Sequence, residues 1–88
     1  MTNDDAQKLS ILMLQINALM DQSTAFVQDK YSEEEFHKYR LQAGEVMGPV
    51  CNILNNIYSG HPDLKPTQIG GTYSIPDDIF KNKFYERK

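Results

Sequence analysis

The sequence has little cysteine, few histidines and no excess of basic charge. Cys51 is the only cysteine among the 88 residues, so an intramolecular disulfide is excluded. One cysteine and two histidines also cannot build a closed Cys/His zinc site. Nine basic against twelve acidic side chains give a net charge of −3. This balance argues against a dedicated nucleic-acid binder, because phosphate contacts need a basic surface.

A basic leader and a long apolar run are also missing. The first residues, Met-Thr-Asn-Asp-Asp, are acidic where a secretory signal would be basic, and Gln15 and Asn17 interrupt the apolar stretch that follows. We therefore expect a cytoplasmic protein with no membrane partner. Folding at this length buries only roughly 60–65% of the surface that the unfolded chain exposes. A second copy of the chain is the expected source of further stability.

The first third of the chain has apolar residues at helical spacing. Thr2 and Asp5 have the spacing of a capping box, and the pattern predicts a helix from about residue 3 to residue 28. Its main apolar stripe consists of Leu9, Leu12, Met13, Ile16, Leu19, Met20, Ser23, Phe26 and Val27. A second set of apolar residues lies outside that stripe and needs another cover, either the tail of the chain or a second copy: Ile11, Leu14, Ala18 and Ala25.

A second helix is predicted from about residue 33 to residue 59. Ser32 and Glu35 form a second capping box, and Gly60 supplies a C-terminal stop. Pro49 lies inside this helix, so we expect either a kink or two helices in line. The predicted apolar stripe consists of Phe36, Tyr39, Ala43, Val46, Met47, Val50, Ile53, Leu54 and Ile57.

The connection between the two helices has about four residues, which makes them antiparallel. Residues 1–60 are therefore predicted to form a helical hairpin, and residues 61–88 an irregular tail packed on it within one domain. In the tail, a short helix is predicted from Ser74 to about residue 85. The tail's expected apolar anchors are Leu64, Ile69, Tyr73 and Ile75. The fold class is all-α, and two hairpins are expected to dimerise into a four-helix bundle.

Few residues have the chemistry for catalysis or metal binding. Glu34 and His37 have the i, i+3 spacing of helical di-metal sites, but the first helix offers no inward carboxylates to complete one, so we favour a solvated first turn. Cys51 has no neighbouring base in the sequence, and Gly70-Gly71-Thr72 lacks the lysine of a phosphate loop. We expect no catalytic residue, no metal and no cofactor, and hence no enzyme.

The last eight residues interleave bases with two aromatic residues, Phe84 and Tyr85. Such a segment can bind nucleic acid by stacking on bases and meeting phosphates. On an acidic protein we favour the alternative, in which the segment meets acidic groups of the same chain such as those of Glu33 to Glu35.

The stretch from Tyr31 to Pro66 is similar to known sequences. Its most distinctive parts are Ser32-Glu33-Glu34-Glu35-Phe36, Val46-Met47-Gly48 and Ile57-Tyr58-Ser59-Gly60-His61-Pro62-Asp63-Leu64-Lys65-Pro66. In these parts the chain resembles a group of small uncharacterised bacterial helical proteins. The resemblance implies a bacterial cytoplasmic setting and assigns no activity to any residue.

The surplus of apolar surface, together with the absence of catalytic motifs, favours a non-enzymatic protein–protein interaction or adaptor module that acts as a homodimer. The alternative is a small acidic inhibitor or immunity protein that binds a basic toxin or enzyme, and a remote alternative is a metal-binding helical bundle that uses Glu34 and His37. The candidate interaction surface consists of Ile11, Leu14, Ala18, Ala25, Glu33, Glu34 and Glu35.

Overall fold

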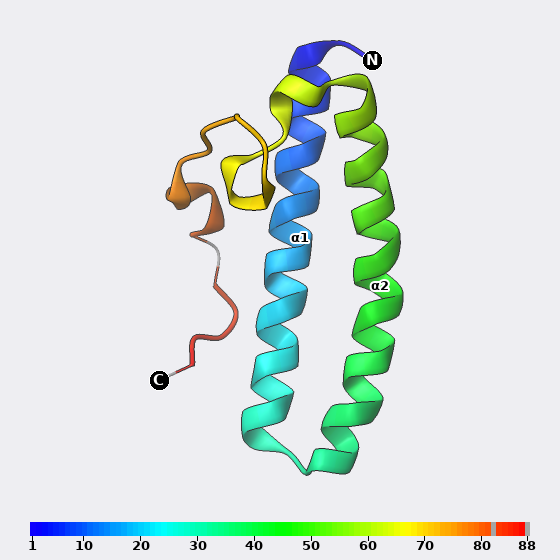
Figure 1. Cartoon of the computed structure of the whole chain (residues 1–88). Helices are drawn as coiled ribbons and strands as arrows, with labels where there is room; N and C mark the ends of the chain where they lie inside the picture. The colour runs from blue at the N-terminus through cyan, green and yellow to red at the C-terminus, as the bar shows by residue number, and fades with distance from the viewer. Residues whose placement is uncertain (82, 88) are drawn as a thin grey trace.

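A computed structural model describes residues 1–81 and 83–87 of the chain. Two long helices, α1 (Asn3–Lys30) and α2 (Glu33–Gly60), lie side by side and antiparallel (Figure 1). Three short 3₁₀ turns follow: η1 (Pro62–Leu64), η2 (Thr67–Ile69) and η3 (Asp77–Phe80). The predicted all-α helical hairpin is confirmed, since the described residues contain no β-strand beyond one isolated bridge.

Local sequence signals account for where the helices begin. The Thr2 hydroxyl accepts a hydrogen bond from the Asp5 amide, and the Ser32 hydroxyl accepts one from the Glu35 amide, each at 3.2 Å. Each bond satisfies one of the amides that a helix N-terminus leaves without a partner. The observed ends agree with the predicted ends to within two residues.

Pro49 does not divide the second helix. Helix α2 continues through it without interruption, so the alternative of two helices in line is wrong (Figure 1). Pro49 is exposed, so the helical hydrogen bond that is lost because proline has no backbone N–H lies on the solvent side of the helix.

The core lies at the open end of the hairpin, where the tail joins it. Its buried members come from all three parts of the chain: Ala6, Ser10, Val50, Leu54, Ile57, Tyr58, Leu64 and Ile75. Small residues at the helix contact, such as Ala6, Ser10 and Ala43, let α1 and α2 approach closely.

Four members of the predicted helical stripes lie outside this core, so that part of the core prediction is wrong. Leu9, Leu12, Val46 and Ile53 are 38%, 46%, 46% and 44% exposed. Helix α1 contributes the small residues Ala6 and Ser10 to the buried core, and Met13, Leu14 and Ile16 pack against it, so Leu9 and Leu12 are left outside.

After α2, the chain makes a closed loop from Lys65 to Tyr73. The Tyr73 amide donates to the Lys65 carbonyl at 3.0 Å, and the Gly71 amide donates to the Pro66 carbonyl at 2.8 Å. Pro66 is fully buried. Leu64 and Ile75 are buried and Tyr73 packs against the core, as predicted, but Ile69 is 47% exposed and is not an anchor.

The tail then runs down the side of α1 that faces away from α2 (Figure 1). The predicted helix from Ser74 to residue 85 is wrong, because only the four-residue turn η3 forms. Further along, the amides of Phe84 and Tyr85 donate to the Gln22 side chain rather than to carbonyls one turn earlier. A tertiary contact therefore replaces the helical hydrogen bonds that local sequence favours.

Candidate interaction surfaces

Two rows of residues lie beside each other along the face of the hairpin that carries the exposed leucines. Leu9, Ile16 and Ser23 recur every seven residues on α1, and Tyr39, Val46 and Ile53 do so on α2. The Tyr39 hydroxyl donates to the Ser23 hydroxyl at 2.8 Å, which fixes the antiparallel register of the two rows. The same register brings Ile16 level with Val46, and Leu9 level with Ile53. We call these three pairs, with Leu12 and Leu19 beside them on α1, the open face.

The open face carries no charge over its central length. The face itself consists of Leu9, Leu12, Ile16, Leu19, Ser23, Tyr39, Val46 and Ile53. The adjoining row of α2 has the same seven-residue spacing and is also uncharged: Gln42, Pro49 and Asn56. A quarter of all residues in the chain are charged (24%), so an uncharged stretch of this extent is a distinct surface. Depletion of charge is typical of the centre of protein interfaces.

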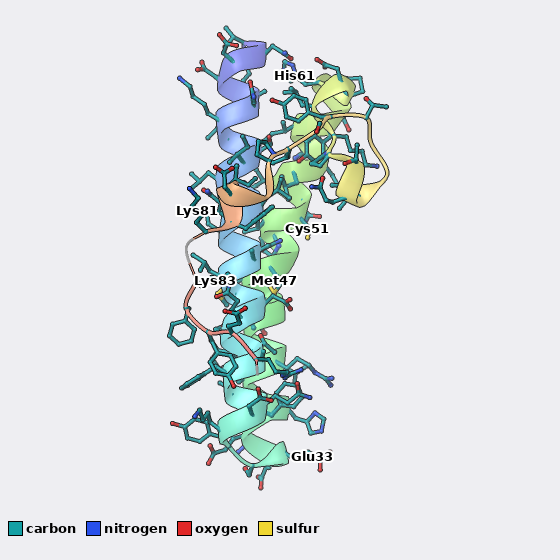
Figure 2. The ribbon with its side chains drawn as sticks, turned by 90° about the vertical axis from the view of Figure 1, so that its left-hand side faces the viewer. Glu33, Met47, Cys51, His61, Lys81 and Lys83 are labelled. Atoms are coloured by element: carbon teal, nitrogen blue, oxygen red, sulfur yellow. The ribbon has the colours of Figure 1, made fainter. Side chains whose placement is uncertain are left out.

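A different row of α1, which we call the tail row, holds the C-terminal segment. It consists of Gln15, Gln22 and Asp29, again seven residues apart. The side-chain amide of Gln15 donates to the backbone carbonyl of Ile79 at 2.6 Å, and the side-chain oxygen of Gln22 accepts from the backbone amide of Phe84 at 2.6 Å. Figure 2 shows the tail, with Lys81 and Lys83, passing along α1.

The tail row explains the position of three of the four predicted surface residues on α1. All four are half-buried, but Ile11, Ala18 and Ala25 lie three or four residues from Gln15 or Gln22, on the same side of α1, whereas Leu14 packs against the core. Of the two covers left open by the sequence, the tail occupies this side.

The end of the tail makes the densest set of polar contacts in this region. Asp29 Oδ2 accepts hydrogen bonds from Tyr85 Oη at 2.8 Å and from Arg87 Nε at 3.0 Å, while Gln28 Oε1 accepts one from Arg87 Nη2 at 2.7 Å. The Arg87 guanidinium and the Tyr85 hydroxyl hold the pKa of Asp29 below its usual value of 3.8. The basic tail does meet an acidic group of its own chain, and that group is Asp29.

Glu33, Glu34 and Glu35 lie at the turn end of the hairpin, far along α1 and α2 from His61 (Figure 2). All three are exposed, and two of them contact a side chain one turn along the helix: Glu34 forms an ion pair with Lys38, and Glu33 Oε1 lies near His37 Nε2, both at 3.6 Å. Exposed i, i+4 pairs contribute only about 0.3–0.5 kcal/mol each. Within residues 1–81 and 83–87, no three His, Cys, Asp or Glu side chains are grouped as metal ligands would be.

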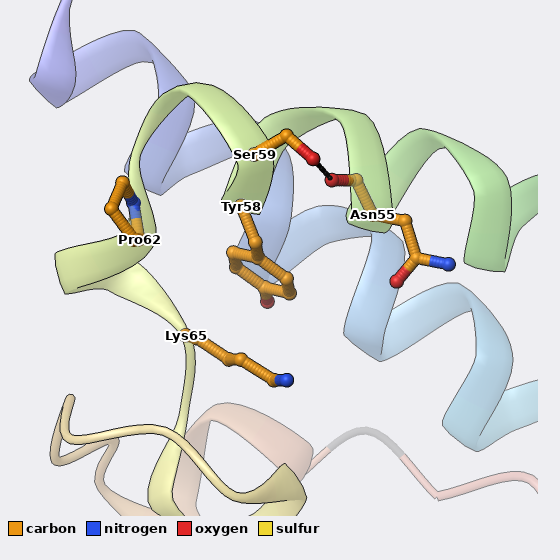
Figure 3. Close-up of a pocket in the computed structure, with 5 residues that line it drawn as sticks. All are labelled: Asn55, Tyr58, Ser59, Pro62 and Lys65. Atoms are coloured by element: carbon orange, nitrogen blue, oxygen red, sulfur yellow. Dashed lines mark hydrogen bonds between the residues drawn. The ribbon is translucent and has the colours of Figure 1, made fainter.

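The contacts around His61, Cys51 and one surface hollow are structural. His61 Nδ1 lies 3.0 Å from Asn3 Oδ1 and so ties the end of α2 to the start of α1. Cys51 is exposed, with Asn17 Nδ2 3.4 Å from its sulfur. The hollow, of about 390 Å³, is lined by Asn55, Tyr58, Ser59, Pro62 and Lys65 (Figure 3).

That hollow offers little chemistry. The Ser59 hydroxyl donates to the Asn55 carbonyl within α2 at 2.9 Å, so its proton is engaged in the helix (Figure 3). Lys65 is the only charged side chain in the lining, and the Tyr58 ring forms the wall behind it. Burial raises the pKa of Tyr58 above its usual value of 10.0, so its hydroxyl keeps its proton near neutrality.

Comparison with protein-family models, with curated proteins and with solved structures finds no match to this chain. No helix in the described part of the chain is both long enough and apolar enough to cross a membrane.

Proposed function

We propose that the chain is a non-enzymatic protein–protein interaction module that acts as a homodimer, and that two copies pair through the open face. The observation that carries the proposal is the exposure of Leu9, Leu12, Val46 and Ile53 on one uncharged face of the hairpin. The tail lies along another side of α1, so it leaves this face free (Figure 1).

The dimensions of the face suit a second copy. The open face occupies residues 9–23 and 39–53, roughly 21 Å of helix, at the centre of two 28-residue helices that are each roughly 42 Å long and together roughly 20 Å wide. Pairing along the full length of both helices would cover on the order of 800 Å² of each copy, as in a stable interface of standard size, with the open face as its uncharged central half.

The chemistry of the face also favours self-pairing. In a symmetric dimer the same residues of both copies meet, so a charged face would place like charges together. The open face avoids this repulsion, and its seven-residue repeats are the spacing at which helices of a four-helix bundle interdigitate.

Sedimentation equilibrium tests the proposal directly. The wild-type chain is expected at twice its mass of 10.1 kDa at micromolar concentration, and the variants Leu12→Asp and Ile53→Asp are expected as monomers with the same helical circular dichroism. Leu41→Asp is the matched control, because Leu41 is 70% exposed but lies five residues before Val46, about 140° round α2. A monomeric wild-type chain, or equal dissociation of the Leu41 variant, would overturn the homodimer.

The acidic turn end is not part of this proposal. Glu33 and Glu34 are paired with bases of their own helix, and their pairing supplies a local reason for their presence. The inhibitor hypothesis for Glu33 to Glu35 stays a prediction.

A further inference from the structure

The contacts at the end of the tail show how α1 holds a short peptide segment. Residues 83–87 contain no helix or strand. The surface that receives them consists of Gln22, Phe26, Gln28 and Asp29, all within two turns of α1, and we call it the peptide site. Its polar atoms that meet the tail are all hydrogen-bond acceptors, and its one aromatic ring lies among them.

Different residues of the peptide site contact the backbone and the side chains of the segment. Gln22 Oε1 accepts from two successive backbone amides, those of Phe84 at 2.6 Å and Tyr85 at 3.1 Å. Successive amides point to the same side only where the backbone bends, as it does at Phe84, so this contact requires a bent chain rather than a particular side chain. The Phe26 ring lies edge-on to both the Phe84 and the Tyr85 rings, with centroids 5.3 Å apart in each case. Such pairs contribute about 0.5–1.5 kcal/mol beyond the area they bury.

The remaining contacts select a base two residues further on. Asp29 accepts from both Tyr85 and Arg87, and Gln28 accepts from Arg87. A cation here also meets the negative end of the α1 dipole. Glu86, between the two, pairs with Lys83 inside the tail at 3.4 Å. The recognised pattern is therefore aromatic, aromatic, any residue, arginine.

We propose that the peptide site binds a short, bent aromatic–aromatic–any–arginine segment of a partner protein, and that the chain's own Phe84 to Arg87 occupies the site as a competing internal ligand. Phe84 remains 60% exposed when docked, so the tail lies in a shallow site and is held by few contacts. Local structure of this kind opens well below the free energy of global unfolding. The proposal does not depend on the homodimer, because every contact of the peptide site with residues 83–87 lies within one copy of the chain.

Tethering decides how strongly the tail competes. A segment on a short flexible link is present at an effective concentration of about 1 mM. If a free peptide binds the empty site with a Kd of about 0.1 mM, the docked tail weakens its apparent binding by about tenfold. The partner segment is therefore expected to bind only when the tail is displaced or when the partner binds more tightly.

A fluorescently labelled peptide with the sequence of residues 81–88 is the probe, and the full-length chain is the receptor. In one receptor variant, Phe84→Ala, Tyr85→Ala and Arg87→Ala together empty the site. Fluorescence anisotropy is expected to show saturable binding to this emptied variant and binding about tenfold weaker to the wild-type chain. Circular dichroism confirms that the emptied variant retains its helices.

Two further substitutions on the emptied variant locate the binding. Asp29→Asn is expected to weaken peptide binding at least tenfold, whereas Asp21→Asn, at an exposed acid of the same helix outside the peptide site, is expected to leave it unchanged. If the emptied variant fails to fold, excess unlabelled peptide is added to the ¹⁵N-labelled wild-type chain, where displacement shifts the amide resonances of Phe84 and Tyr85. Absence of saturable binding, or an Asp29 variant that binds as well as the Asp21 variant, would refute the peptide site.

Discussion

Replacing Gly71 by alanine tests how the loop after α2 holds the tail in place. A Cβ atom on Gly71 would lie 1.9 Å from the Lys65 carbonyl oxygen and 2.4 Å from its carbonyl carbon. These are backbone atoms, so no side-chain rotation relieves the overlap, and the chain at Lys65 must separate from the chain at Gly71. That separation breaks the hydrogen bonds from Tyr73 to Lys65 and from Gly71 to Pro66.

The expected cost follows from those two bonds. At about 1 kcal/mol for each lost backbone hydrogen bond, and with partial exposure of a buried Pro66, Gly71→Ala should lower the free energy of unfolding by about 2–3 kcal/mol. Urea denaturation followed by circular dichroism measures the change. The tail should loosen as well, because this loop returns the chain from the end of α2 to α1.

Two other glycines are matched controls for this substitution. Gly70 has a φ of 91° but open space around its Cβ position, so Gly70→Ala should cost only the left-handed backbone penalty of about 1–2 kcal/mol. Gly44 lies in mid-helix with open space beside it, and Gly44→Ala should stabilise the chain by about 1 kcal/mol. A cost for Gly71→Ala no greater than that for Gly70→Ala would contradict the close approach of Gly71 to Lys65.

Three more substitutions or conditions have defined outcomes. The Tyr58 hydroxyl is buried and makes no hydrogen bond of good geometry, although the Ser10 side chain lies close enough to oppose part of the rise in its pKa. Tyr58→Phe should therefore raise the free energy of unfolding by about 1 kcal/mol in urea denaturation; a loss of stability would show that Ser10 and Tyr58 do form a stabilising hydrogen bond. Ser32→Ala removes the cap on the Glu35 amide and should cost about 1 kcal/mol in the same assay, whereas Ser32→Asp should restore most of it. The pKa of Asp29 is lowered in the docked state, so the stabilisation that ionised Asp29 gives to the docked tail is fully present above pH 3.8 and is lost as pH falls through the lowered value. An acid titration of the Tyr85 amide resonance follows this release, which Asp29→Asn should abolish.

The hairpin was predictable because its determinants are local. Ser32 and Thr2 cap the helices with side chains three residues from the amides they bind, and the short connection leaves no room for any arrangement but an antiparallel one. The all-α class and the helix ends therefore follow from the sequence. Pro49 was ambiguous, since the sequence does not say whether the solvent side of α2 can accommodate the missing amide.

The path of the tail was not predictable from local rules. Ser74 and the acids after Pro76 favour a helix, yet the chain forms only the turn η3, and Gln22 on α1 takes the amides of Phe84 and Tyr85. A glutamine on a distant helix gives no local signal that it will serve as an acceptor. The peptide site was missed for the same reason, although the aromatic and basic residues of the tail were recognised as unusual.

The face by which α1 meets α2 was also underdetermined, because α1 carries three rows with a seven-residue repeat. They are Ser10, Asn17 and Thr24; Leu9, Ile16 and Ser23; and Gln15, Gln22 and Asp29. At 3.6 residues per turn these rows lie roughly 100–140° apart, so each can meet a separate partner. Helix α2 contacts the first, as the bond from Asn17 to the Met47 carbonyl shows, and the tail contacts the third. Apolar periodicity identifies the Leu9 row most clearly, and this is the row that the hairpin leaves open. The strongest periodic signal of the helix therefore includes residues that stay exposed, and this is the face through which we propose that two copies pair.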